Sequence, residues 1–225
     1  MKRSEINRAI KQMESMAAKH GFALPPFCAW TPEEWGSKGK EYDEIRDNML
    51  GWDVTDYGLD DFAKAGLTLV TIRNGNYKNP KYDKTYAEKL ILSNENQVCT
   101  MHFHFSKMED IINRGGGTLV IELHNSTAEG EMDSSDVTVN SDGRTYVAPA
   151  GVKVRLRPGE SITLRPGLYH AFWAEEGGGP VLIGEVSQTN DDNTDNRFYE
   201  EMRRFSNIEE DEEPYRLLCN EYPRQ

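Results

Sequence analysis

The sequence predicts an all-β barrel or sandwich, with helical segments before and after it. From residue 66 onward, short runs of β-branched and other apolar residues recur, and Gly, Pro, Asn or Asp separates most of them. This rhythm favours antiparallel strands over a β-α-β sheet. The 225 residues suit one large domain, and we find no repeat or linker that divides them. We therefore expect a single domain over residues 1–225.

Helices are expected before the barrel. Residues 4–20 place apolar side chains at helical spacing, which predicts an amphipathic helix. A second helix is expected to begin at Thr31, because Pro32 and acidic residues then occupy its first turn. Residues 37–60 are charged and mixed, and we interpret them as helix plus loop. Residues 1–65 are therefore predicted to form a helical N-terminal extension.

The barrel itself is predicted over residues 66–190. A turn is expected at Asn74-Gly75. The polar stretch 125–143 is interpreted as an exposed excursion between strands. The strands expected in this region span residues 67–72, 87–92, 97–105, 117–123, 144–147, 151–156, 161–164, 168–174 and 180–187.

Residues 191–225 are predicted to form a C-terminal helix and tail. The helix is expected over residues 195–206, because Phe198, Met202 and Phe205 would lie on one side of it. The acidic run that follows is interpreted as a solvated loop.

Composition excludes several classes of function. The net charge of −12 argues against binding to nucleic acid or to anionic membranes. No apolar run approaches the ~18 residues that a membrane-spanning helix needs. The N-terminus lacks the apolar stretch of a secretory signal, so a cytoplasmic location is expected. Cys28, Cys99 and Cys219 are widely spaced and are expected to be small buried apolar residues.

Four residues form a candidate metal site. On a strand, His102 and His104 point to the same face, and Glu109 follows after a short connection. The chain has five histidines, and His170 ends the stretch Pro166-Gly167-Leu168-Tyr169-His170, where a turn leads into the next expected strand. A single histidine is more often a core or surface residue, but the four residues together indicate one divalent cation.

Two stretches of the sequence resemble the motifs of the cupin family. Two histidines separated by one residue, a later Glu and a Gly at position 116 resemble the first cupin motif. Residues 159–170 resemble the second motif. This resemblance covers about residues 96–175, and it implies a double-stranded β-helix, or jelly roll, around the metal.

Three positions depart from the cupin motifs. Asn96 stands where the first motif opens with Gly, although Asn also tolerates a left-handed backbone. Pro166 and Gly167 are adjacent rather than separated, and Ala174 replaces a terminal Asn. None of these departures removes a metal ligand.

Over most of its length the chain resembles the D-lyxose isomerase family of cupins. The shared features are Gly66-Leu67 through Asn74-Gly75, Glu88-Lys89, Gln97 through Ile111, and Pro166–His170. The resemblance implies interconversion of D-lyxose with D-xylulose, and often of D-mannose with D-fructose. It also implies manganese as the favoured metal and a homodimer.

The candidate ligands suit this reaction. Three imidazoles and a carboxylate bind borderline divalent ions, and they leave two positions free on an octahedral ion. An open-chain sugar could chelate there through O1 and O2, and isomerisation would pass through a metal-stabilised enediol.

Three further residues are candidates for catalysis. Lys107 lies between two of the expected ligands and could steady developing negative charge. Lys89, at the start of an apolar strand, could act similarly. Glu185 interrupts an apolar strand, and a desolvated carboxylate there could move protons. The alternative for each is an outward-facing, solvated side chain.

Substrate contacts are expected near the barrel mouth. Asp191 and Asp192 follow an expected strand there, and Arg203 lies on the expected C-terminal helix. Their alternative is exposed polar surface. Cupins host many reactions, so an iron-dependent dioxygenase and a non-catalytic sugar-binding protein are the alternative functions.

Overall fold

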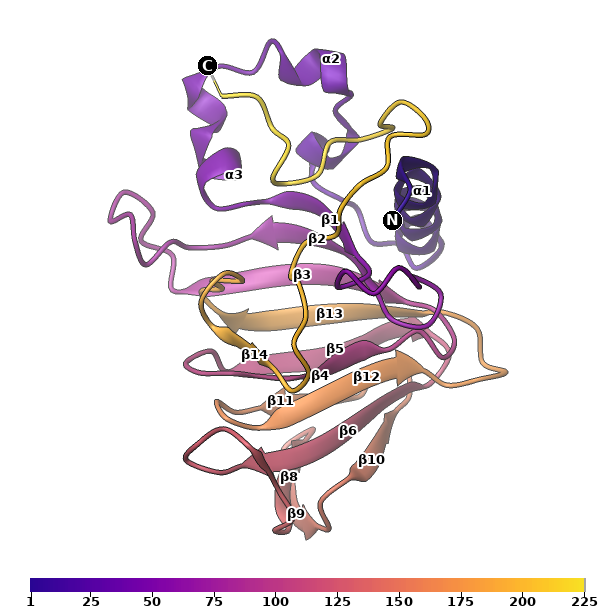
Figure 1. Ribbon diagram of the computed structural model, residues 1–225, viewed down its shortest axis with the longest axis vertical. Helices are drawn as coiled ribbons and strands as arrows, with labels where there is room; N and C mark the ends of the chain where they lie inside the picture. The colour runs from indigo at the N-terminus through magenta and orange to yellow at the C-terminus, as the bar shows by residue number, and fades with distance from the viewer. Residues whose placement is uncertain (225) are drawn as a thin grey trace.

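The computed structural model describes residues 1–224 and consists of two β-sheets that curl against each other (Figure 1). Within residues 1–224, all strand pairs of the two sheets are antiparallel. In spatial order the eight-stranded sheet contains β1 (Gly51–Thr55), β2 (Leu67–Arg73), β3 (Tyr86–Ser93), β13 (Val181–Gln188), β5 (Glu109–Gly116), β11 (Ser161–Leu164), β8 (Val137–Ser141) and β9 (Arg144–Ala148).

The second sheet is six-stranded and supplies the histidines of the candidate site. In spatial order it contains β10 (Val152–Leu156), β6 (Leu119–Ser126), β12 (Tyr169–Ala174), β4 (Cys99–His104) and β14 (Asn196–Phe198), and the short β7 (Met132–Asp133) pairs with β6. Its central strand, β12, lies between β6 and β4.

Apolar residues from both sheets meet inside the barrel. Ile91, Ile111 and Ile183 of the larger sheet share one buried cluster with Ile121 and Leu123 of the smaller sheet. Burying such side chains contributes about 1.5–3 kcal/mol each relative to exposure. Two facing antiparallel sheets around one core form the jelly-roll barrel that the cupin resemblance implies, so the predicted fold class is confirmed.

Helices cover one edge of the larger sheet. Helix α1 (Arg3–Lys19) packs Ile6, Ile10 and Met13 against β1, β2 and β13 in a second buried cluster. It confirms the helix predicted over residues 4–20. No helix within residues 1–224 is long and apolar enough to cross a membrane.

The second predicted helix is present but short. In α2 (Pro32–Trp35), the hydroxyl of Thr31 accepts a hydrogen bond from the Glu34 N–H at 3.3 Å. This cap satisfies an N–H that would otherwise lack a partner. The remaining short helices of this region are η1 (Pro26–Ala29), η2 (Lys40–Tyr42) and α3 (Asp43–Asp47), and Figure 1 shows them with the C-terminal segment above β1.

Five strands lie where the sequence predicts none, and they are β1, β5, β7, β8 and β14. The segment 1–65 is not purely helical, because β1 pairs with β2 along its whole length. Every residue of β1 is buried, and the apolar–polar alternation from Trp52 to Thr55 is too short to distinguish it from the charged stretch around it. The stretch 125–143 is only partly exposed, since Val137 and Val139 on β8 are buried in the barrel core.

The helix predicted over residues 195–206 is wrong. Residues 196–198 form β14, which pairs with β4, and no helix follows within residues 199–224. Phe198 and Met202 both pack against the barrel core, from an extended chain rather than from one helix face. Their spacing is compatible with a helix, but contact with the barrel decides the conformation.

One departure from the cupin motifs has a structural explanation. Asn96 has a φ angle of 59°, in the left-handed region that Gly adopts without strain. Asn is one of the few other residues that enter this region readily. The turn before β4 therefore keeps its backbone geometry although the usual Gly is absent.

Candidate active site

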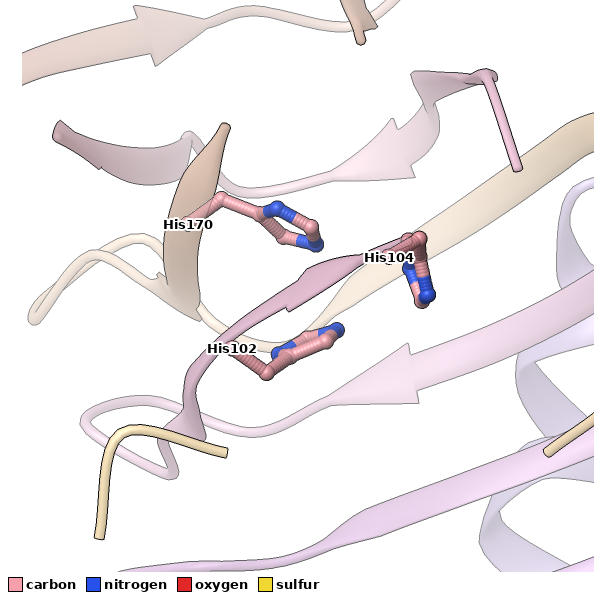
Figure 2. A group of neighbouring side chains, drawn as sticks. All are labelled: His102, His104 and His170. Atoms are coloured by element: carbon pink, nitrogen blue, oxygen red, sulfur yellow. The ribbon is translucent and has the colours of Figure 1, made fainter. Parts of the chain in front are cut away.

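Three histidines meet inside the barrel. His102 and His104 lie on β4, and His170 lies opposite His102 on the neighbouring strand β12 (Figure 2). One ring nitrogen from each of the three lies within 4.8 Å of the others, and all three side chains are buried. Alternation along β4 puts its two imidazoles on the inner face, and cross-strand pairing brings the third beside them.

Backbone carbonyls orient two of the rings. The Nδ1 of His102 lies 2.7 Å from the carbonyl oxygen of Thr100. The Nδ1 of His170 lies 2.9 Å from the carbonyl oxygen of Leu168. A carbonyl can only accept, so each Nδ1 carries the proton and each Nε2 keeps its lone pair. The Nε2 of His170 is buried without a hydrogen-bond partner in residues 1–224, as expected for a metal ligand.

Glu109, the first residue of β5, lies beside the three histidines. Its Oε1 lies 3.3 Å from the Nε2 of His104 and 3.3 Å from the Nε2 of His170. Burial by itself would raise the pKa of Glu109, but Lys107 and His104 hold it well below the ordinary value. The group is therefore an ionised carboxylate facing the histidines.

The protonation states suit a divalent cation. Burial first, and then the neighbouring His170 and His104, lower the pKa of His102 well below its ordinary value. Burial and Lys107 also lower the pKa of His104. Neutral imidazoles and an ionised carboxylate are the forms that bind metals such as manganese, iron, cobalt and zinc. These residues therefore fit a metal ion.

A row of alternating charges continues from the ligands. The Nζ of Lys107 lies 2.6 Å from Glu109 Oε2 and 2.9 Å from Glu185 Oε1. The Nζ of Lys89 lies 3.5 Å from Glu185 Oε1 and 3.5 Å from Asp192 Oδ1. Burial disfavours the charge on Lys107, but Glu109 and Glu185 raise its pKa above the ordinary value. The structure thus brings all three catalytic candidates to one wall.

This wall bounds a small cavity of about 50 Å³. The rest of the lining is mainly apolar and includes Phe198, whose ring centroid lies 5.6 Å from that of His102. A cavity with an ionic wall and an apolar wall can hold a polyol, with hydroxyls toward the charges and C–H groups toward the rings. The main apolar lining residues are Tyr57, Leu67, Leu69, Ile91, Ile111, Phe172 and Phe198.

A family model described as D-lyxose isomerase matches residues 1–222 of the chain. The chain belongs to the D-lyxose isomerase family. This membership confirms the predicted enzyme class, an aldose–ketose isomerase. It also decides against the two alternative functions that the metal motif alone left open, an iron-dependent dioxygenase and a non-catalytic sugar-binding protein.

Similar proteins cover the whole chain. A D-lyxose/D-mannose isomerase of Serratia proteamaculans is 50% identical over 225 residues, which are 100% of this chain and 99% of the relative. A D-lyxose/D-mannose isomerase of Escherichia coli O157:H7 is 48% identical over 223 residues, 99% of this chain and 98% of the relative. The structure of Cellulomonas parahominis L-ribose isomerase with L-psicose has a TM-score of 0.62 at 16% identity, covers 93% of this chain and 98% of its own, and shows the shared fold.

The three substrate-contact candidates lie in different places. Asp192 lines the cavity of this D-lyxose isomerase family member. Asp191 lies outside that lining, lines a separate cavity of about 140 Å³, and forms an ion pair with Lys78 at 2.6 Å. Arg203 does not reach the cavity either, because it is exposed and its side chain lies over Gly58.

The arginine that lines the cavity is Arg204, which sequence reasoning missed. Its Nη2 lies 2.9 Å from Asp192 Oδ2 and also bonds the carboxylate of Asp53 on β1. Burial disfavours the charge, but Asp53 and Asp192 raise the pKa of Arg204 well above its ordinary value. No local pattern distinguishes Arg204 from its neighbour, since the chain there is irregular rather than helical.

Proposed function

We propose that this protein interconverts D-lyxose and D-xylulose, and also D-mannose and D-fructose, with one divalent metal ion per subunit and manganese favoured. One observation carries the proposal: two of the three clustered histidines, together with Glu109, share a cavity with Lys107 and Glu185. The names of the two relatives at 48–50% identity support the choice of sugars.

The ligands in this proposal are His102, His104, Glu109 and His170. When bound, the metal would polarise the sugar carbonyl and acidify the neighbouring C–H bond. The unpartnered Nε2 of His170 and the ionised Glu109 support this set.

Glu185 is the proposed base. It lies on β13 at the cavity wall, and its side chain is 6% exposed, so water competes little for it. In the aldose-to-ketose direction it would take the proton from C2 and return it to C1. The carbonyl oxygen at C1 gains a proton, and the hydroxyl at C2 loses one, so the overall reaction is balanced.

The two lysines support the charge changes. The ammonium of Lys107 lies between Glu109 and Glu185 and would donate a hydrogen bond to the sugar oxygen that becomes negative. Lys89 would hold the Glu185 carboxylate in place from the other side. Asp192, which lines the same cavity, would accept hydrogen bonds from sugar hydroxyls.

The metal requirement is tested by removal and replacement. Protein stripped with a chelator should form no ketose from D-lyxose or D-mannose, and manganese should restore xylulose formation above fructose formation. Magnesium reloading is the control, because this hard ion prefers oxygen ligands. Absence of ketose from both sugars, with manganese shown to be bound, would refute the proposal.

The route of the hydrogen is tested in deuterated water. Transfer by Glu185 predicts deuterium at C1 of xylulose formed from D-lyxose, because a carboxylate exchanges its proton with solvent. Repeated turnover without label would instead indicate a hydride shift. The predicted homodimer and the cytoplasmic location remain predictions, and sedimentation of the purified protein measures the first.

A further inference from the structure

Arg204 carries a hydrogen-bond donor that no residue of the described chain satisfies. Its Nη1 is buried and has no hydrogen-bond partner within residues 1–224. A buried guanidinium N–H without an acceptor destabilises the protein, because it has lost its hydrogen bonds to water. Arg204 lines the metal-site cavity, so a molecule bound there can supply the acceptor.

Three other contacts fix the position of this donor. The Nη2 of Arg204 binds Asp53 on β1 and Asp192 beside the cavity. The hydroxyl of Thr55 donates a hydrogen bond to the Arg204 carbonyl oxygen at 3.0 Å. Contacts therefore fix Arg204 at its backbone carbonyl and at Nη2. Its free Nη1 is held in one position before a ligand binds.

The same ion pairs select the chemical class of that ligand. Two carboxylates already balance the single positive charge of Arg204. A phosphate or carboxylate group would be repelled by these two carboxylates while it bound the guanidinium. A neutral hydroxyl accepts the hydrogen bond without this repulsion. The free Nη1 thus favours a hydroxyl of an uncharged sugar.

Arg204 also lies away from the metal ligands along the ionic wall. Asp192 separates it from Lys89, and Lys89 in turn contacts Glu185. Lys107 then links Glu185 to the ligand Glu109. A sugar whose C1 and C2 lie at the metal would therefore extend its other end toward Arg204.

We propose that Arg204 is a specificity-determining residue that donates, through Nη1, a hydrogen bond to a hydroxyl at C4 or C5 of an unphosphorylated sugar. This role rests on the proposed function, which places C1 and C2 at the metal. It adds a substrate contact at the opposite end, from a residue outside the metal and proton-transfer groups.

The test couples one enzyme variant with sugars that lack one hydroxyl. Arg204→Lys keeps the charge beside Asp53 and Asp192 but has a single nitrogen. The manganese-loaded variant is expected to lose about 10- to 100-fold in kcat/KM for D-lyxose. The kcat/KM of wild type should fall by a similar factor when D-lyxose is replaced by either 4-deoxy- or 5-deoxy-D-lyxose, whichever lacks the contacted hydroxyl. The kcat/KM of the variant should fall little further with that deoxy sugar. Equal losses in both enzymes for both deoxy sugars would overturn the proposal.

Binding provides a readout that needs no turnover. D-Arabinitol, the reduced form of D-lyxose, should bind to Arg204→Lys at least about tenfold more weakly than to wild type by calorimetry. Arg197→Met is the matched control, since Arg197 lies on β14 and pairs with Glu131. Unchanged binding to Arg204→Lys would refute the contact. Wild-type protein that binds the alditol but forms no ketose would instead refute the proposed function.

A folding defect in the variant is separable from a lost contact. Circular dichroism and metal content should match wild type. If Arg204→Lys does not fold, the double variant Asp53→Asn with Arg204→Gln removes opposite charges together and takes its place. The same weakening of alditol binding is expected, and wild-type binding would overturn the proposal.

Discussion

The Nζ of Lys107 lies 2.9 Å from Oε1 of Glu185, although 78 positions separate the two residues in the chain. Lys107 belongs to the connection between β4 and β5, whereas Glu185 lies on β13, which pairs with β5. Pairing of β5 with β13 therefore brings the proposed acid–base group to the ligand Glu109. This contact suggests the first variant to test.

Glu185→Gln should lower kcat about 10²- to 10⁴-fold, because the amide cannot accept a proton from carbon. Steady-state kinetics and metal analysis measure this, and metal content should stay at the wild-type level. Glu88→Gln is the control, since Glu88 lies on neighbouring β3 and pairs with Arg73 instead. Full turnover by Glu185→Gln would exclude this residue as the base.

His102→Ala should abolish turnover and lower metal content together, because three ligands bind a divalent ion more weakly than four. Metal analysis after dialysis, paired with an activity assay, tests this. His124→Ala is the matched control, since His124 contacts Glu122 on the same strand rather than the cavity. Retention of both metal and activity by His102→Ala would show that the ligand set is wrong.

Asp195→Ala should lower stability by about 1–2 kcal/mol and reduce kcat without removing metal. The Asp195 carboxylate accepts hydrogen bonds from the N–H groups of Ser106 at 2.8 Å and Lys107 at 3.0 Å. Its loss should loosen the connection that carries Lys107. Urea denaturation and kinetics measure both effects. Asp133→Ala, which removes a similar turn contact with Ser135, should change stability only.

The cysteine thiols should be unreactive in the folded protein. Burial raises the pKa of Cys28 to about 12 and also that of Cys99 to about 12. At pH 8.5 their thiolate fraction is then about a thousandfold below that of an unfolded cysteine. The folded state binds these protons more tightly, so their contribution to stability is complete below pH ~8.5 and declines as pH rises toward 12. Iodoacetamide labelling with and without urea tests this, and rapid native labelling would contradict it.

Much of the site was predictable because its information is local. Strand alternation puts His102 and His104 on one face whatever surrounds them. The structure also buries Cys28, Cys99 and Cys219 as free thiols, as their spacing predicts. These predictions need only the sequence around each residue.

Other features depend on contacts between distant segments. Strand β1 alternates apolar and polar residues over only four positions, inside a charged stretch that reads as helix plus loop, and its pairing with β2 makes it a strand. Phe198 and Met202 have helical spacing, but the barrel core holds them from an extended chain. In both cases packing overrides the local pattern.

The sequence by itself predicted the barrel, most of its strands, and the three histidines that meet inside it. Only the tertiary structure decided that Arg204, rather than Arg203, reaches the cavity. The chain there is irregular, and the direction of each side chain depends on how the chain docks. Here the docking is set by Thr55 and Asp53 on β1, about 150 residues away in the sequence, and no local pattern encodes such a contact.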